Sequence, residues 1–597
     1  MKVSSGKEIF KVIEHHVDLC VVGGGMAGML AAITAARHGS KVLLMNDRPI
    51  LGGNASSEVR MWIRGAHGAN MKETGILEEI ALENIYRNPG LNFSIWDSVL
   101  YEKVRFEPNI ELLLNCSCCE LGMDNDRIQV VKGWQTTTQK WHIVNAKLFA
   151  DCSGDSILAP ISGAEWRWGR EASDEFNEDI EPSKADAGTM GMSCLLQARE
   201  TGSPSIYIPP KWAYAYTKES LPFRIRLDEP RDWMKDNYWW MELGGEQDTI
   251  HDTEELRDEL LKVAFGVWDF IKNSGHCDAR DWELDWVGFL PGKRESRRYL
   301  GDHVLTQNDV RSEGRFDDIV AYGGWSMDDH HPGGIQYEGR STIFHPAPSP
   351  YGIPYRCLYS KNIHNLLFAG RNISATHAAL SSTRVMATCA MLGQAVGTAA
   401  FIAIRDGLDP RGVYEKKIDE LKQTLMDDDC YLPWNAHHVS EITEKANIIA
   451  SGGDPSPLVN GIDRPVGEDY NGWTGTLGSW VELDFGTKID INCARMVFDS
   501  DLDRETWEGL DDNIRTFPMR CNISAHEKPV YIPKTLVKAF RLDIPDEEGG
   551  WKVVYRENHN YQRLVKVDLC LSTSRIRLVL EATWGSKDVR MFAFEVR

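Results

Sequence analysis

The stretch VDLCVVGGGMAGMLAAITAARHG, near the start of the chain, constrains the fold more than any other. An apolar, β-rich run at residues 17–22 leads directly into Gly23, Gly25 and Gly28, which have GxGxxG spacing, and a helix-forming run follows. A strand, a tight glycine turn and a helix N-terminus together form a site whose free amides receive a pyrophosphate. The alternative is a glycine-rich turn without a ligand, but the flanking strand and helix favour a dinucleotide-binding unit.

A second strand, KVLLM at residues 41–45, ends at an unusual residue for such a unit. Asn46 stands where a carboxylate usually accepts hydrogen bonds from the adenosine ribose. An amide oxygen can still accept one, so we expect Asn46 to meet the ribose. Asp47 is the rival, although successive residues of a strand point to opposite faces. Asn46 could also simply begin a turn.

The glycine pair Gly52-Gly53 in PILGG follows this strand. This arrangement resembles FAD-binding flavoproteins of the glutathione-reductase type rather than NAD dehydrogenases. From about residue 15 to 405 the chain resembles the FAD-dependent oxidoreductase family that is sometimes labelled xanthan-lyase-like. The stretches that carry the resemblance are GGNASSEVR, DCSGDS, SGAEWRWGRE, GKRESRRYLGDHVLTQND, IPYRCLY and AGRNISATHAALSSTRVMATCAMLGQAVGTAA.

Two distant segments are implied to complete the flavin site. The buried strand LFADCSGDS ends at Asp155, which in such flavoproteins returns to the nucleotide; the alternative is that Asp155 caps the next helix. A long helix of small residues is expected from about Ser382 to Ile404, with its N-terminus at the pyrimidine edge of the flavin. The predicted cofactor-binding residues are Gly23, Gly25, Met26, Ala27, Gly28, Asn46, Asp47, Arg48, Gly52, Gly53, Asn54, Asp155, Gly370, Arg371, Ser382, Thr383 and Arg384.

Residues 166–360 are predicted to form an α+β substrate domain, inserted between the two parts of the flavin-binding domain. They are dense in Trp, His, Arg and acids, as in WRWGRE, PPKWAYAYTKES, NYWWMELGGE and GGWSMDDHHPGG. Aromatic faces beside hydrogen-bonding groups suit a polyhydroxylated ring. An ordinary aromatic core with loops is the alternative.

Oxidation of an alcohol by a flavin requires a base for the hydroxyl proton. His377, in the turn before the long helix, is the first candidate, and a purely structural hydrogen bond to the turn is its alternative. His330 and His331, in a glycine-rich loop, are the next candidates. Arginine is a poor base, so it is given binding roles only. The predicted substrate-binding residues are Glu58, Arg60, Arg297 and His303.

The C-terminal part changes to short strands separated by turns, such as WVELDFG, SRIRLVLEA and MFAFEVR. Such spacing predicts a β-sandwich. The run LVNGIDRPVGEDYNGWTGTLGSWVELDFGTKIDINCARMVF resembles the galactose-binding-like, discoidin-type jelly roll. This fold implies either glycan binding or inert packing.

The charge and composition of the chain limit its expected partners and location. The 88 acidic and 66 basic residues give a net charge of -22, which disfavours nucleic-acid and anionic-membrane partners. The first twenty residues lack the apolar core of a signal peptide, so a cytoplasmic protein is expected. The 13 cysteines lack the spacing of a metal site, and no metal is expected.

The predicted organisation is an α/β, Rossmann-type FAD-binding domain at residues 15–165 and 361–430, the substrate domain at 166–360, and an all-β jelly roll at 440–597. The predicted function is FAD-dependent oxidation of a hydroxyl carbon of a carbohydrate or glycoside, with non-covalent FAD. No second GxGxxG unit is seen, so the electron acceptor stays open, as does the oligomeric state. The alternatives are a C–C desaturase or fumarate-reductase-like reductase, and a carbohydrate-binding or lyase-type protein with a structural flavin.

Overall fold

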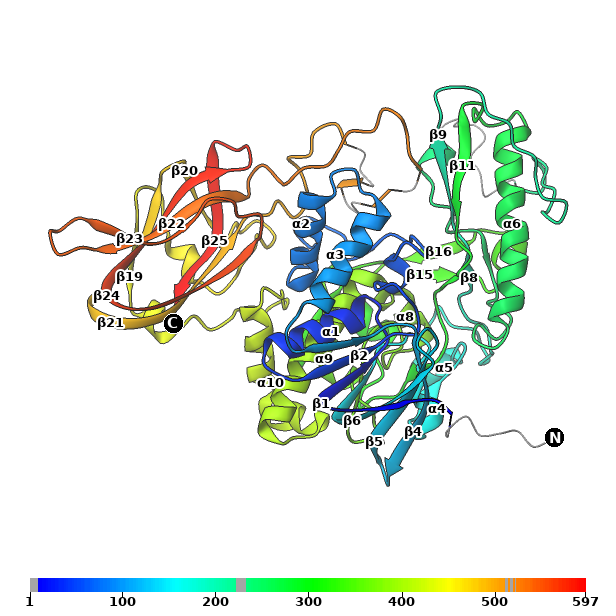
Figure 1. The fold of residues 1–597 in the computed structure, drawn as a ribbon, viewed down its shortest axis with the longest axis horizontal. Coiled ribbons are helices and arrows are strands. Elements are labelled where there is room, and N and C mark those ends of the chain that lie inside the picture. The colour runs from blue at the N-terminus through cyan, green and yellow to red at the C-terminus, as the bar shows by residue number, and fades with distance from the viewer. Residues whose placement is uncertain (1–8, 222–231, 511–513, 516–518, 521) are drawn as a thin grey trace. The chain divides into compact units, whose positions relative to one another are not determined.

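The computed structural model describes residues 9–221, 232–510, 514–515, 519–520 and 522–597. The chain forms two compact units. The first contains residues 1–66, 92–421 and 519–528, and the second contains residues 67–91, 422–518 and 529–597. The predicted combination of an α/β part with a C-terminal all-β part is confirmed (Figure 1).

The first unit is organised around a seven-stranded sheet of order β3-β2-β1-β6-β5-β4, with β18 paired to β6. β1, β2, β3, β6 and β18 run parallel to one another, whereas β4 and β5 form an antiparallel hairpin, and β5 pairs antiparallel with the first half of β6. β6 therefore pairs with both the antiparallel hairpin and the parallel part of the sheet. The strands are β1 (Val12–Val22), β2 (Val42–Met45), β3 (Ile110–Leu113), β4 (Cys116–Asp124), β5 (Arg127–Gln135), β6 (Lys140–Asp151) and β18 (Leu366–Phe368).

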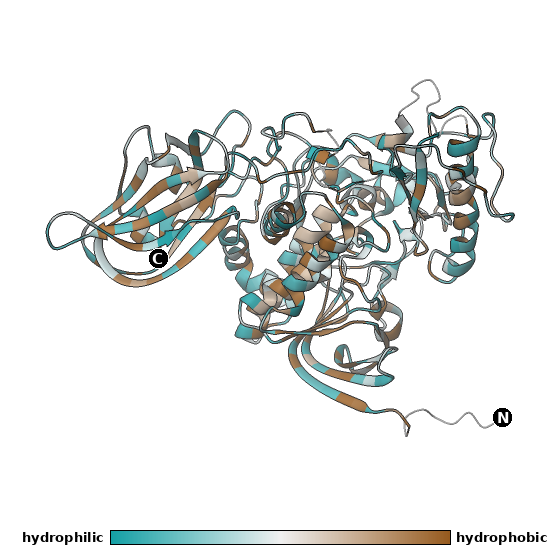
Figure 2. Ribbon diagram, turned by 45° about the horizontal axis from the view of Figure 1, so that its top comes forward, coloured by the Kyte–Doolittle hydropathy of each residue, from teal (hydrophilic) through white to brown (hydrophobic). Residues whose placement is uncertain are grey.

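The helices α1 (Met26–Arg37) and α9 (Met386–Asp406) pack directly against each other because both are rich in small residues. A Cβ at Gly393 would stand 2.1 Å from the carbonyl oxygen of Ala27, and one at Gly397 would stand 2.4 Å from that of Ala31. α9 is long and apolar enough to cross a membrane, but 89% of its apolar window is buried inside the protein. Both helices are strongly apolar in Figure 2, as buried core helices are.

Residues 166–360 form small antiparallel sheets beside one long helix, α6 (Thr253–Asn273). The apolar face of α6 packs on Trp233, Trp240 and Trp282, all buried. These three tryptophans therefore belong to an ordinary aromatic core, which was the alternative to a surface for a polyhydroxylated ring. The elements used below are β7 (Trp166–Arg167), β13 (Arg298–Tyr299), β15 (Met327–His330), α5 (Ser173–Phe176), α7 (Gln307–Arg311) and α8 (His377–Thr383).

The second unit is built on an all-antiparallel seven-stranded sheet of order β20-β25-β21-β24-β22-β23, with β19 paired to β21. Two strands, β21 and β24, are at least twice as long as the others and carry two register shifts along their shared ladder. The predicted all-β character is thus confirmed. The strands are β19 (Asn447–Ala450), β20 (Trp473–Thr476), β21 (Trp480–Phe498), β22 (Val537–Pro545), β23 (Trp551–Glu557), β24 (Leu564–Thr583) and β25 (Asp588–Val596).

The second unit also includes a segment from the N-terminal part of the chain. Helix α2 (Ile76–Arg87) contributes Leu82 and Ile85 to the same core as the strands. The ring of Tyr86 stacks on Tyr561 with centroids 4.2 Å apart. The sequence analysis assigned residues 67–91 to the flavin-binding domain, whereas here they lie in the second unit. The four predicted domain boundaries stay predictions.

Candidate functional site

The turn between β1 and α1 contains two glycines, Gly23 and Gly28, at which packing within the chain leaves no room for a side chain. A Cβ at Gly28 would stand 1.9 Å from the carbonyl oxygen of Gly23, and a Cβ at Gly23 would stand 2.4 Å from that of Cys152. Gly25 differs, because the nearest atom to its Cβ would be Gly53 Cα at 3.9 Å. Packing within the chain leaves this space open, and a phosphate that approaches the backbone requires such a space.

A second glycine loop lies against the first. The N–H of Gly52 donates to the carbonyl oxygen of Gly24 at 2.8 Å, and Gly52 has a φ of 101°. A Cβ at Gly53 would stand 3.1 Å from Gly25 Cα. The two loops therefore form one backbone-lined hollow, which we call the glycine cradle. It consists of Gly23, Gly25, Gly28, Gly52 and Gly53.

Asn46 supports this cradle through its side chain. Its Oδ1 accepts the N–H of Gly24 at 2.9 Å, and its Nδ2 donates to the carbonyl oxygens of Arg48 at 3.0 Å and Ile50 at 3.1 Å. Both amide hydrogens are thus used, and only Oδ1 keeps a lone pair for a ribose hydroxyl. The Asp47 side chain is 63% exposed. Contact between Asn46 and the ribose stays a prediction, now restricted to Oδ1.

Asp155, at the end of the β6 region, is enclosed by cations. Lys293 Nζ lies 2.8 Å from its carboxylate, and Arg371 forms a second ion pair with it. Burial acts to raise the pKa of Asp155, but Arg371 and Lys293 outweigh burial and hold the pKa below its usual range. The alternative that Asp155 caps the next helix does not hold, because the carboxylate of Asp151 accepts the N–H of Leu158 at 2.8 Å.

The predicted single helix from Ser382 to Ile404 is in fact two helices. α8 ends at Thr383, and α9 begins after Val385, whose extended backbone (ψ 143°) interrupts the helical hydrogen bonds. The N–H of Ala387, in the first turn of α9, donates instead to the carbonyl oxygen of Arg64 at 2.9 Å. Gly370 takes a φ of 119° where β18 leads into this region. The start of α9 is therefore a separate helix N-terminus.

The residues present fit an FAD molecule. The cradle offers backbone amides for its pyrophosphate. Near the start of α9, Thr383 Oγ1, Arg384 Nε and Thr388 Oγ1 are buried without a hydrogen-bond partner among the described residues, as is Glu58 Oε2 after the second glycine loop. A bound ring bearing nitrogens and carbonyls would satisfy such atoms. FAD supplies hydride-accepting chemistry at that ring when bound.

His377, the first residue of α8, lies in a buried group of acids. Its Nδ1 is 2.9 Å from Glu295 Oε2 and its Nε2 is 3.3 Å from Asp329 Oδ1, while its backbone N–H donates to Glu171 Oε2 at 2.9 Å. Burial acts to lower the pKa of His377, but Glu295 and Asp329 outweigh burial and hold the pKa well above its usual range. His377 is therefore an imidazolium with both ring nitrogens paired, which suits a proton donor better than a base.

Glu181 completes this group. It is 6% exposed, and neither carboxyl oxygen has a hydrogen-bond partner among the described residues. Burial raises the pKa of Glu181 to about 7; His377 acts against this rise and Glu171 adds to it. A carboxyl group that titrates near neutrality can exchange protons at working pH. We call Glu171, Glu181, Glu295, Asp329 and His377 the acid–imidazole cluster.

The other two candidate histidines are held differently. His330 is buried, with Nδ1 2.6 Å from Glu242 and Nε2 3.2 Å from Asp328. His331 stacks on Tyr337 with ring centroids 3.5 Å apart. Burial lowers the pKa of His331, so its ring is neutral at pH 7. His331 thus keeps a more base-like state than His377.

The predicted substrate-binding residues do not form one group. Arg60 lies over the ring of Trp286 at 4.2 Å and donates to Gln197 Oε1 at 2.5 Å. Burial raises the pKa of Glu58. Arg297 Nη1 donates to the carbonyl oxygen of Asp155 at 3.3 Å, beside the predicted cofactor residues.

His303 belongs to a helix cap. Its Nε2 is 3.0 Å from Asp309 Oδ2, and Asp309 closes the capping box of α7 with Thr306. The ring also packs edge-on against Phe316. A substrate-binding role for His303 stays a prediction with no support from this arrangement.

Sequence reasoning missed the four carboxylates around His377. Three of them lie in quoted stretches: Glu171 ends WRWGRE, Glu295 lies in GKRES, and Asp329 precedes the two histidines in MDDHH, whereas Glu181 lies outside all of them. For these three the available signal was an acid within a few residues of an Arg or His. Nothing local distinguished these acids from exposed ones, because burial is set by segments far apart in the chain.

Two groups of side chains contain residue types that can bind a metal ion. Burial raises the pKa of Cys116 to about 12, so this thiol keeps its proton. In the second unit His437, Asp463 and Glu595 converge within ligand distance of one another. Arg495 Nη2 lies 2.6 Å from Asp463 and its Nη1 3.0 Å from Glu595, so a cation already neutralises this group.

Comparison with known proteins gives short or low-scoring matches for individual relatives. A soluble pyridine nucleotide transhydrogenase from Marinobacter nauticus is 44% identical over 43 residues, which span 7% of this chain and only 9% of the relative's length. The family 32 carbohydrate-binding module of Streptococcus pneumoniae EndoD is 15% identical, with 26% of this chain and 99% of the module covered at a TM-score of 0.20. A Clostridium perfringens module of the same family, solved with GalNAc-β-1,3-galactose, is 10% identical, with 26% and 96% covered at a TM-score of 0.18.

The family itself is identified over most of the chain. Residues 18–425 match the model of the FAD dependent oxidoreductases. The matched range includes the glycine cradle, the acid–imidazole cluster and both α8 and α9. The protein is therefore an enzyme that uses FAD, and the chain belongs to the FAD dependent oxidoreductase family.

Proposed function

We propose that the protein oxidises a hydroxyl-bearing carbon of a carbohydrate or glycoside, with hydride transfer to flavin N5. The observation that carries the proposal is Glu181, a buried carboxyl group without a hydrogen-bond partner among the described residues and with a pKa raised by burial to about 7. Loss of hydride from an alcohol carbon requires removal of the hydroxyl proton. Glu181 in its ionised form can accept that proton, and no other member of the acid–imidazole cluster has both oxygens free of hydrogen bonds.

The remaining residues of the acid–imidazole cluster would set the protonation state of Glu181. The imidazolium of His377 stabilises the ionised form, whereas burial and Glu171 stabilise the protonated form. These opposing influences place the titration near neutrality. Glu295 itself stays ionised, because His377 and Arg298 outweigh its burial and lower its pKa.

Anaerobic mixing with neutral sugars and their methyl glycosides tests this function. We expect at least one of them to bleach the oxidised flavin absorption at about 450 nm, a wavelength set by the cofactor. The Glu181→Gln variant should bleach at least about a hundredfold more slowly, because general base catalysis contributes about 10²–10⁴-fold. A panel in which no sugar bleaches the flavin contradicts the proposal.

A second function is favoured by the protonated state of His377. An imidazolium beside the site could donate a proton to a carbon centre, as a fumarate-reductase-like reductase or the reverse of a C–C desaturase requires. Reoxidation of chemically reduced enzyme by an enone or fumarate, without bleaching by any sugar, would select this alternative.

We also propose that FAD is bound without a covalent bond. The stretch GGNASSE beside the cradle contains no His, Cys or Tyr that could form one. Denaturation should release the yellow colour into the supernatant. A yellow protein pellet would contradict this expectation.

A further inference from the structure

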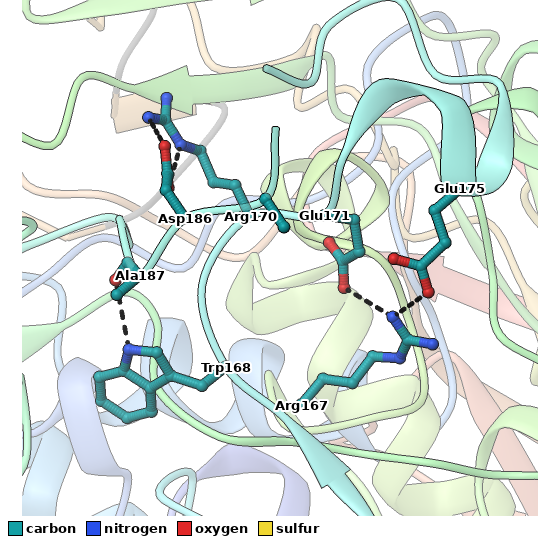
Figure 3. A pocket seen from close by; sticks show the side chains of 8 residues that line it. Arg167, Trp168, Arg170, Glu171, Glu175, Asp186 and Ala187 are labelled. Carbon is teal, nitrogen blue, oxygen red and sulfur yellow. Dashed lines mark hydrogen bonds and ion pairs between the residues drawn. The ribbon is translucent and has the colours of Figure 1, made fainter. Parts of the chain in front are cut away.

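A cavity of about 330 Å³ that opens to solvent lies in the first unit (Figure 3), and its lining includes Glu171 of the acid–imidazole cluster. The side chains of Arg167, Trp168, Arg170, Glu175 and Asp186 line it. All of them come from the short stretch around β7 and α5 and the loop that follows. This volume lies at the lower end of the range for small-ligand sites.

Glu171 joins the cavity to the cluster. Its side chain lines the cavity, its Oε2 accepts the backbone N–H of His377, and its Oε1 lies 3.0 Å from Arg298 Nη2. This carboxylate is 4% exposed and is therefore fixed in position. A ligand in the cavity would consequently lie next to the group that is proposed to exchange protons.

The charges that line the cavity are already paired. Arg170 binds Asp186 through two hydrogen bonds, of 3.0 and 2.5 Å, and Arg167 Nη1 lies 2.6 Å from Glu175 Oε1, as Figure 3 shows. An anionic ligand would have to displace a carboxylate from its guanidinium, and a cationic ligand would have to displace a guanidinium. A neutral ligand with many hydroxyl groups avoids both costs, because it can donate to the free carboxylate lone pairs and accept from the remaining guanidinium N–H groups.

Two further features point to a ligand with a ring. The indole of Trp168, anchored by a 3.3 Å hydrogen bond to the carbonyl oxygen of Ala187, supplies a flat apolar surface. Arg167 Nε is a buried donor without a hydrogen-bond partner among the described residues. An apolar face combined with polar edges matches the two surfaces of a sugar ring.

We infer that this cavity is the binding site for the sugar ring of a neutral pyranoside. The inference rests on the proposed function and deepens it by naming the site and the charge of the substrate. Glu171 positions the ring relative to the cluster, and the paired arginines select against uronic acids and amino sugars.

Calorimetric titration of the FAD-loaded protein tests the site. The probes are methyl β-D-glucopyranoside, methyl β-D-galactopyranoside, glucuronic acid and glucosamine. We expect at least one neutral glycoside to bind at least about tenfold more tightly than both charged sugars. We also expect Trp168→Ala to weaken that binding about tenfold or more, a loss of about 1.4 kcal/mol. Trp212→Ala is the matched control, because Trp212 is 51% exposed and does not line the cavity.

These experiments distinguish a failure of the proposed sugar site from a failure of the proposed hydroxyl oxidation. Preferred binding of a charged sugar, or equal binding by the Trp168→Ala and Trp212→Ala variants, overturns the site even if a glycoside bleaches the flavin. Binding that depends on Trp168 without any bleaching leaves the site intact and overturns hydroxyl oxidation. Arg170→Gln gives a second measure, because an unpaired Asp186 should then improve glucosamine binding relative to glucuronic acid.

Discussion

The glycine cradle and the acid–imidazole cluster belong to the same unit but are built in opposite ways. The cradle uses backbone groups from residues 23–53. The cluster uses side chains from segments that are as much as about two hundred residues apart, from Glu171 to His377. The cradle is therefore sensitive to one added carbon atom, whereas the cluster is sensitive to one lost charge.

Removal of the central cation should have the largest effect. His377→Leu leaves the buried Glu295 and the partly buried Asp329 without their imidazolium, and we expect a loss of about 3–5 kcal/mol in the free energy of unfolding. The folded pKa of His377 lies above its unfolded value of about 6.5. Its contribution is thus fully present below about pH 6.5 and is lost as the pH rises through the folded pKa. Denaturant unfolding of both proteins from pH 6 to 10 should show the difference shrinking at the alkaline end; a constant difference would contradict the paired imidazolium.

The cradle offers a matched pair of glycine substitutions. Gly28→Ala places a Cβ 1.9 Å from a backbone carbonyl oxygen and should cost about 3 kcal/mol in stability, with loss of FAD. Gly25→Ala meets no atom of the chain closer than 3.9 Å, so the apoprotein should keep its melting temperature while FAD affinity falls about tenfold or more. Thermal melting with and without FAD distinguishes the two. Equal destabilisation of both apoproteins would show that the space at Gly25 is not reserved for a ligand.

The neutral amide of Asn46 supports the glycine cradle, and a charged carboxylate should not replace it. Asn46→Asp keeps the acceptor for the Gly24 N–H but removes both donors to the carbonyl oxygens of Arg48 and Ile50. We expect a loss of about 2 kcal/mol in stability, because two partly buried hydrogen bonds are lost and both carbonyl oxygens then face a carboxylate. Urea unfolding measures it, with Asp47→Asn as the exposed control. An unchanged midpoint would mean that the amide does not support the cradle.

Glu181→Gln should have the smallest effect on stability and the opposite sign. The folded pKa of Glu181, about 7, lies above its unfolded value near 4.5, so folding binds a proton between these two values. The wild-type protein therefore loses stability as the pH rises from about 4.5 to 7, and the variant does not. We expect the variant to be more stable than the wild-type protein at pH 8 and equally stable at pH 4. A variant that is less stable at pH 8 would indicate that Glu181 has a partner in the folded protein.

The cradle could be predicted from sequence because its determinants are local. The spacing of three glycines between an apolar strand and a small-residue helix fixes a turn whose geometry does not depend on distant residues. The glycine pair at 52–53 follows the next strand at a short distance, so it too could be placed. The family match over residues 18–425 agrees with this prediction.

The helix break at Val385 and the placement of α2 could not be predicted in the same way. Val385 lies in a continuous run of helix-compatible residues, and the N–H of Ala387 after the break donates to the carbonyl oxygen of Arg64, a residue far away in the sequence. Helix α2 has an ordinary amphipathic sequence, which does not show which apolar surface it will cover. Its apolar residues pack in the core of the second unit, over 350 residues further along the chain.

By itself the sequence determined the nucleotide-binding turn, the α/β and all-β halves and the cofactor, since each follows from residue spacing over a few dozen positions. Only the tertiary structure decided the ionisation of His377 and Glu181 and the use of Asn46 as a support for the turn. A pKa depends on desolvation and on charges within a few ångströms. The residues that supply those charges are brought together by folding, so no local pattern records them.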